Sequence, residues 1–210
     1  EMAVEELSYE ANPIARSMKN NKTGTIGVIT EDICGVFYPY VVKGINSVAD
    51  EKGYQIMICD AQGTYGDKQA IKREKELFRR MIASRVDGII FVSSVSTENR
   101  EKYFSQIKKQ ANKYKKIPLV SIERDLTSVG IDFDGYVNAK MATQHLIDCG
   151  CKKIGHITGP THMEIVKERV KGYKDCLREN NLYFGDEMIT HGDYSHLSGY
   201  VAVKQLMKQV

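Results

Sequence analysis

Short apolar runs alternate with longer amphipathic stretches along most of the chain. The runs are four to six residues long, rich in Ile and Val, and mostly apolar at consecutive positions. Consecutive apolar residues are typical of strands that are buried on both faces of a parallel sheet. The predicted strands are Thr25–Thr30, Tyr54–Cys59, Gly88–Val92, Pro118–Ile122, Ile154–Thr158 and Met188–His191.

The stretches between these runs carry apolar residues at the i, i+3, i+4 and i+7 spacing of an amphipathic helix. The predicted helices are Tyr40–Lys52, Asp67–Ser84, Asn99–Tyr114, Tyr136–Asp148, Lys167–Asn180 and Ser195–Lys208. The inward faces of the first and last of them would be Val41, Ile45, Val48 and Ala49, and Leu197, Tyr200, Val203, Leu206 and Met207. Charged residues of the second helix are expected on its outer surface. The regular alternation predicts an α/β fold with doubly wound parallel sheets and right-handed crossovers.

Two segments interrupt the alternation and suggest the domain organisation. Asp125–Gly135 shows no regular pattern, and we interpret it as the segment where the chain crosses between two subdomains. Near the start, Asn12 and Pro13 suit the N-cap and first position of a short helix, which a polar linker, Lys19–Gly24, separates from the first strand. We therefore expect a short helix and a linker over residues 1–24, and two lobes over residues 25–134 and 135–210. The second lobe looks incomplete.

Composition narrows the class of protein. The 210 residues are 42% hydrophobic and 27% charged, which is typical of a globular chain, and the net charge of +3 is too small to indicate nucleic-acid binding by itself. The five cysteines follow no metal-binding spacing and are expected to be buried free thiols in a reducing compartment. Charge-free stretches reach about ten residues, half of the ~20 that a membrane helix needs. The acidic first residues do not resemble a signal peptide.

No enzyme signature is present, so we predict no catalytic residues, no metal and no cofactor. The chain lacks a G-x-G-x-x-G after its first strand, a P-loop, a G-x-S-x-G and an H-E-x-x-H. Its histidines fall on different elements, and His145, on an amphipathic helix, is expected to be structural.

Ligands of open α/β sheets bind beyond the carboxyl ends of the strands. In this sequence those ends are polar, charged and aromatic. They are Glu31-Asp32, Phe37-Tyr38, Asp60, Ser93-Ser94, Glu123-Arg124, Gly159-Pro160 and Gly192-Asp193-Tyr194. Aromatic faces and charged groups together suit a polar small molecule such as a sugar.

Several motifs follow one another along nearly all of the chain. Tyr9–Met18 has the pattern Y-x-x-N-P-x-A-R-x-M, and Arg85–Ile90 reads R-V-D-G-I-I. The others are Lys22–Ile29, Phe37-Tyr38 with Lys43–Ile45, Gly53-Tyr54, Ile117–Val120 with Glu123-Arg124, Gln144–Leu146 with Gly150–Ile154 and Gly159-Pro160, and Glu168-Arg169 with Gly172-Tyr173. In this order and spacing, the motifs resemble those of the LacI/GalR family of bacterial transcription regulators.

The resemblance implies a helix-turn-helix, a hinge helix and a two-lobed effector domain of the type 1 periplasmic-binding-protein fold. Residues 1–24 would then be the end of the DNA-binding domain, the hinge helix and the linker. By this comparison, the helix-turn-helix and the C-terminal part are missing from the sequence. The resemblance places effector contacts at six positions in the cleft between the lobes. They are Tyr38, Phe37, Glu123, Asp134, Arg169 and Tyr194. Met163 and Ile165 occupy positions where a purine-responsive member has polar contacts, so a purine is disfavoured.

The resemblance also implies DNA contacts in the hinge segment. Asn12, Ala15 and Met18 match positions that approach the minor groove, where an apolar side chain wedges into a base step and kinks the duplex. Arg16 could contact phosphates. Met18 departs from the family's usual leucine but is also apolar and flexible.

The leading hypothesis is therefore a cytoplasmic regulator that binds operator DNA as a homodimer and senses a small molecule, with a sugar favoured. Its hinge helices would be ordered only on DNA, because so short a helix is marginal alone. The alternative is a secreted periplasmic-type sugar-binding protein of an uptake system. A third possibility is an enzyme on a flavodoxin-like sheet. The sequence shows no paired nucleophile and base that would support it.

Overall fold

The chain forms two compact units, Glu1–Asp132 and Phe133–Val210, which are described separately below. The computed structural model describes residues 22–62, 68–93, 95, 100–113, 116–122, 129–131, 133–183 and 185–208.

Unit 1 is built on a five-stranded parallel sheet. Its strands are β1 (Thr25–Thr30), β2 (Gln55–Asp60), β3 (Gly88–Phe91), β4 (Leu119–Ile122) and β5 (Gly130–Ile131). Their order is β2-β1-β3-β4-β5, so β1 is paired on both sides, with Ile26 opposite Ile56 of β2 and Gly88 of β3. A parallel sheet with β1 inside it leaves all its carboxyl ends along one edge.

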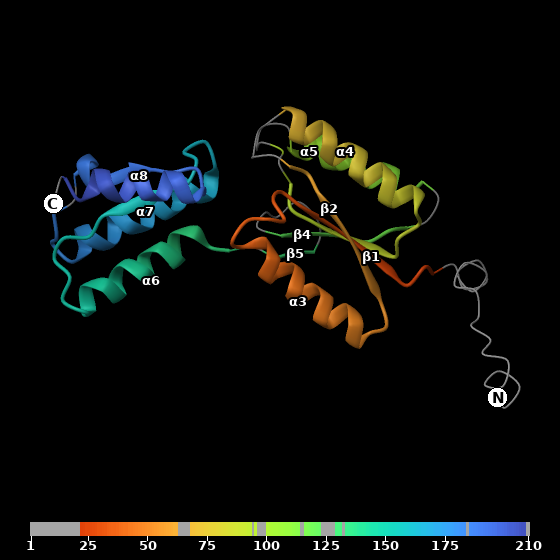
Figure 1. The fold of residues 1–210 in the computed structure, drawn as a ribbon, viewed down its shortest axis with the longest axis horizontal. Coiled ribbons are helices and arrows are strands. Elements are labelled where there is room, and N and C mark those ends of the chain that lie inside the picture. The colour runs from red at the N-terminus through yellow and green to blue at the C-terminus, as the bar shows by residue number, and fades with distance from the viewer. Residues whose placement is uncertain are drawn as a thin grey trace, which may run out of the picture. The chain divides into compact units, whose positions relative to one another are not determined.

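Helices cover both faces of this sheet. Figure 1 shows α4 (Lys68–Ala83) and α5 (Arg100–Ala111) on one face, and α3 (Tyr38–Glu51) on the other. The core lies under α4 and α5, where Phe91 of β3 stacks on Phe104 with ring centroids 5.3 Å apart and meets Phe78 edge-on at 5.0 Å. Aromatic pairs in these geometries add to the stabilisation that burial of their area provides.

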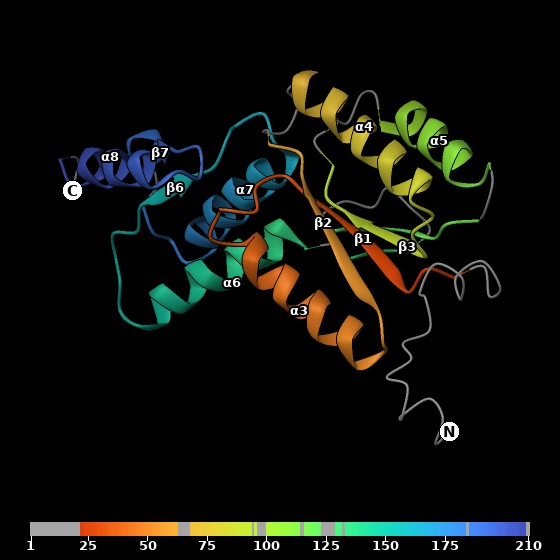
Figure 2. The same cartoon turned by 45° about the vertical axis from the view of Figure 1, so that its right-hand side comes forward.

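Unit 2 has a two-stranded parallel sheet between helices. Its elements are α6 (Gly135–Asp148), β6 (His156–Thr158), α7 (Glu164–Glu179), the 3₁₀ helix η2 (Asp186–Met188), β7 (Ile189–His191) and α8 (His196–Leu206). Figure 2 shows α6 beside α7, which packs on β6, while α8 packs on β7. Helices α6 and α7 lie very close together at Gly172 of α7, where a side chain would overlap the carbonyl oxygen of Tyr136 in α6.

Most predicted elements are confirmed to within three residues at each end. Glycines follow the ends of two helices in the left-handed conformation that favours this residue: Gly53 after α3 and Gly150 after α6 have φ of +71° and +90°. The short strand β5 was not predicted and lies inside the segment expected to be irregular. A two-residue strand offers no periodicity for a sequence pattern to reveal.

The predicted inward faces of two helices were wrong. Of the α3 face, only Ala49 is buried, and Val48 is 58% exposed. Along α8 only Ala202 is buried, while Leu197 and Met207 are 72% and 76% exposed. A helix buries its apolar side only where there is a surface to receive it, and within the described part of unit 2 that surface is two strands wide.

Other burial predictions also need correction. Strand β2 is not buried on both faces, because Met57 and Ile58 are exposed on this edge strand. Glu74 of α4, expected outside with the other charges, is fully buried. For His145 the structural role stays a prediction: the residue is exposed, and its Nε2 lies 3.8 Å from the Cys149 sulfur.

The cysteines are all free, but only Cys176 is buried. Cys34, Cys149 and Cys151 are exposed and Cys59 is intermediate, so the prediction of buried thiols was wrong for most of them. No helix in the described ranges has the length and apolar character to cross a bilayer.

We expect Gly172→Ala to destabilise unit 2 by about 1–3 kcal/mol, because its methyl group would push α7 away from α6. Urea unfolding measures the change. The matched control is Gly199→Ala in α8, where an added methyl meets no heavy atom within 4 Å. It should raise stability by about 0.5–1 kcal/mol through helix propensity alone. Equal effects of the two changes would contradict the close helix contact.

Candidate functional site

The carboxyl edge of the unit 1 sheet is held together beyond its strands. The Ala61 amide donates to Thr30 O at 2.8 Å, and the Val92 amide donates to Ile29 O at 2.9 Å. The chain leaving β2 and the chain leaving β3 are thus both attached to the end of β1. Polar residues that follow these strands are placed along one rigid edge.

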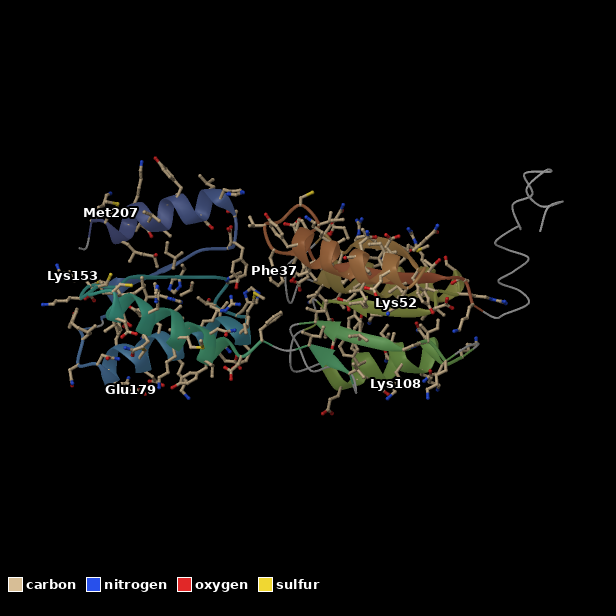
Figure 3. All side chains as sticks on the ribbon, turned by 90° about the horizontal axis from the view of Figure 1, so that it is seen from below. Phe37, Lys52, Lys108, Lys153, Glu179 and Met207 are labelled. Atoms are coloured by element: carbon tan, nitrogen blue, oxygen red, sulfur yellow. The ribbon has the colours of Figure 1, made fainter. Side chains whose placement is uncertain are left out.

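Tyr38 lies on this edge at the first residue of α3. Its hydroxyl donates to Glu31 Oε2 at 3.2 Å, and its ring meets Phe37 edge-on with centroids 5.3 Å apart. Phe37 is the exposed N-cap residue, so its ring projects from the end of the helix. Figure 3 shows Phe37 and Lys52 at opposite ends of α3. Two aromatic rings and a carboxylate therefore meet at the end of β1.

Asp60 ends β2 and lies at the same edge. Its Oδ1 accepts from the Gln62 amide at 2.7 Å, and its carbonyl oxygen accepts from Arg73 Nε at 3.2 Å. Gln62 has a left-handed φ of +50°, which is unusual for a residue other than glycine. The hydrogen bond to the Asp60 carboxylate thus stabilises the turn after β2.

The carboxyl edge of the unit 2 sheet joins β6 to β7. Thr158 Oγ1 lies 3.0 Å from His191 Nδ1 and 2.8 Å from Gly159 O. The Gly192 amide donates to Thr158 O at 2.9 Å. Thr158 thus joins the ends of the two strands through both its side chain and its backbone.

Tyr194, three residues after β7, is strained and exposed. Its φ is +70°, a conformation that costs a non-glycine residue about 1–2 kcal/mol. Its ring lies against Gly159 at the end of β6, where any side chain would overlap it. Asp193 anchors the next turn: hydrogen bonds from Ser195 and Ser198 hold its pKa at about 2. Strain at an exposed aromatic residue beyond the carboxyl ends of the strands favours a functional role.

Arg169 projects from α7 near β6. Burial, with a smaller contribution from the nearby Arg169 guanidinium, lowers the pKa of His156. The imidazole of His156 stacks on Tyr173 with centroids 5.0 Å apart, and the Tyr173 hydroxyl donates to Ile154 O at 2.6 Å. The Arg169 guanidinium is therefore close enough to His156 to disfavour a second positive charge there.

Asp134 is the N-cap residue of α6. Its Oδ1 accepts from the Val137 amide at 2.8 Å and caps α6. The next residue, Gly135, packs against Ile165 and Glu168 at the start of α7. Asp134 therefore lies close to the turn of α7 that carries Arg169.

The structure thus brings Phe37 and Tyr38 together in unit 1. In unit 2 it places Asp134 next to the start of α7, which carries Arg169, and it places Tyr194 against Gly159 after β6. Glu123, Asn12, Ala15, Arg16 and Met18 lie outside the described residues. Within the described ranges, no group of three or more His, Cys, Asp or Glu side chains could hold a metal ion. The sequence did not predict that the Tyr194 ring packs against Gly159, because a glycine after a strand indicates only a turn.

The family described as "Periplasmic binding proteins and sugar binding domain of LacI family" matches residues 23–210, and the chain belongs to it. Catabolite control protein A of Priestia megaterium is 35% identical over 98% of this chain and 59% of its own length. The chain spans about three fifths of the curated relatives it matches.

Two solved structures extend this comparison. The lac repressor dimer bound to operator and the anti-inducer ONPF has a TM-score of 0.76 and 19% identity, covering 99% of this chain and 59% of that one. A periplasmic binding protein/LacI transcriptional regulator from Alkaliphilus metalliredigens, complexed with D-xylulofuranose, has a TM-score of 0.60 and 28% identity, covering 81% and 56%. The periplasmic-binding-protein-like α/β fold predicted from the sequence is confirmed.

The strain at Tyr194 can be measured with two substitutions that both remove the ring. Tyr194→Gly should be more stable than Tyr194→Ala by about 1 kcal/mol, because only alanine keeps a Cβ in the left-handed conformation. Thermal or urea unfolding compares them directly. Equal stabilities would show that residue 194 is unstrained.

Arg169→Met is expected to raise the pKa of His156, because it removes a positive charge that disfavours the imidazolium form. The His156 imidazole can be titrated by NMR. The pKa of His156 is lower in the folded state than in the unfolded state. His156 therefore stabilises the fold at pH values above its unfolded-state pKa, and this contribution is lost as the pH falls through its folded-state pKa. Arg178→Met, near the other end of α7, is the matched control. An unchanged His156 pKa in Arg169→Met would place the guanidinium elsewhere.

Proposed function

We propose that this chain is the effector-sensing part of a transcription regulator of the LacI family. The observation that carries the proposal is the family match over residues 23–210, together with a 35% identical relative named as a catabolite control protein. The relatives compared above are named as regulators rather than as enzymes, and we propose that this protein likewise has no catalytic activity.

The effector is a small polar molecule, with a sugar the favoured class. The rings of Phe37 and Tyr38 on unit 1, and of Tyr194 on unit 2, offer faces for the apolar side of a sugar ring. The Arg169 guanidinium supplies paired donors for hydroxyl oxygens. The relative complexed with D-xylulofuranose supports this class. Met163, a buried residue, and Ile165 make purine recognition less favourable.

Glu123 and Asp134 complete the proposed effector contacts. Glu123 is the residue after β4 in the sequence, and we propose that its carboxylate contacts the effector. Asp134 has one oxygen committed to the α6 cap, which leaves the other able to accept from a hydroxyl.

The DNA-binding role belongs to the hinge segment. We propose that Asn12, Ala15 and Met18 approach the minor groove and that Arg16 contacts phosphate. The protein acts as a homodimer in the cytoplasm. The lac repressor dimer bound to operator supports both the dimer and the DNA partner.

Calorimetric titration of the full-length protein against pentoses, hexoses and their phosphates tests this proposal. At least one sugar should bind, and Arg169→Met should weaken it by about tenfold or more, the loss of a charge-assisted hydrogen bond. Arg178→Met should bind as the unmodified protein does. A bound sugar whose affinity is the same in Arg169→Met would remove Arg169 from the site, and binding of no sugar would reject the proposed effector class.

A further inference from the structure

Glu74 is a fully buried carboxylate in unit 1. It lies on α4, and its Oε1 accepts hydrogen bonds from Ser93 Oγ and from the Tyr103 hydroxyl, each at 2.9 Å. Ser93 is also fully buried, and Tyr103, on α5, is 5% exposed. One oxygen therefore links α4, α5 and the chain that follows β3.

The Ser93 hydroxyl makes a second hydrogen bond that depends on the first. Its oxygen accepts from the Val95 amide at 3.2 Å, at the point where the chain leaves the carboxyl edge of β3. A hydroxyl has one hydrogen, so donation to Glu74 leaves the lone pairs of Ser93 for the Val95 amide. Removal of the carboxylate would free the hydroxyl to rotate and to give up this amide.

The network is built around one Glu74 oxygen that accepts two hydrogen bonds. Burial, with Glu74 as a nearby negative charge and hydrogen-bond acceptor, strongly raises the pKa of Tyr103, so the phenol keeps its proton and donates. Burying a charged group is costly unless it is hydrogen-bonded, and an apolar side chain would fill the same space at lower cost. The carboxylate is therefore better explained by the chain segment that it holds than by packing.

We propose that Glu74 is a positioning residue that holds the backbone at Ser93 and Val95 in a defined conformation on the carboxyl edge of unit 1. Its relevance to effector binding rests on the proposed function, because that edge is the proposed effector surface. Glu74 touches no ligand in this proposal. It acts through the Ser93 hydroxyl, and Tyr103 anchors the carboxylate from α5.

Native-state amide hydrogen exchange, followed by NMR on this chain without any ligand, tests the proposal independently of the effector. The reporter is the exchange rate of the Val95 amide divided by that of the Ile29 amide in β1, which reports global opening. Glu74→Met keeps the volume but removes the acceptor, and should raise this ratio at least tenfold. Ser93→Ala should raise it similarly. Glu74→Gln, which retains an acceptor oxygen, should stay within about threefold of the unmodified protein.

Two controls separate positioning from loss of stability. Leu77→Ala truncates another buried side chain of α4 and should speed both amides in proportion, leaving the ratio unchanged. Tyr103→Phe removes the other donor to the same oxygen and should also leave the ratio unchanged. The proposal is overturned if Glu74→Met leaves the ratio unchanged, if Leu77→Ala raises it equally, or if the Val95 amide is already unprotected in the unmodified protein.

Discussion

The parallel pairing of β1 with β2 on one side and β3 on the other is the constraint on which unit 1 depends. It forces α3 and α4 to return the chain to the start of the sheet, and it leaves every strand pointing at the same edge. The hydrogen bonds of Ala61 and Val92 to the end of β1 extend that pairing beyond β2 and β3. Residues far apart in the sequence, such as Tyr38 and Asp60, thereby come to lie on one edge.

In unit 2 the two strands are also parallel, and their carboxyl ends also lie along one edge. The backbone bond between Gly192 and Thr158 joins the two strand ends, and Tyr194 then turns into α8 in a left-handed conformation. Gly159 leaves room for its ring, and Ser195 caps the helix that follows. The strain is tolerated because hydrogen bonds fix the surrounding turn: the Asp193 amide donates to Ser198 Oγ, and the Ser195 amide donates to Asp193 Oδ1.

Sequence periodicity predicted most of this fold because strand and helix lengths depend on local patterns. The positions of Phe37, Tyr38 and Tyr194 at strand ends followed from the same patterns. Burial was harder to predict, because it depends on what covers a surface. Val48 and Leu197 satisfy the helical spacing yet are exposed. Glu74 reads as one more charge on a charged helix, and only the fold shows that Ser93 and Tyr103 surround it.

The central proposal is that this chain belongs to a regulator in which small-molecule binding is coupled to binding of operator DNA. The most direct measurement is the dissociation constant of the effector for the full-length protein with and without saturating operator, together with that of operator with and without effector. The account predicts that both ratios differ from one by about 5–150-fold and equal each other, because allosteric coupling is reciprocal. Effector binding that is indifferent to the presence of operator would contradict it.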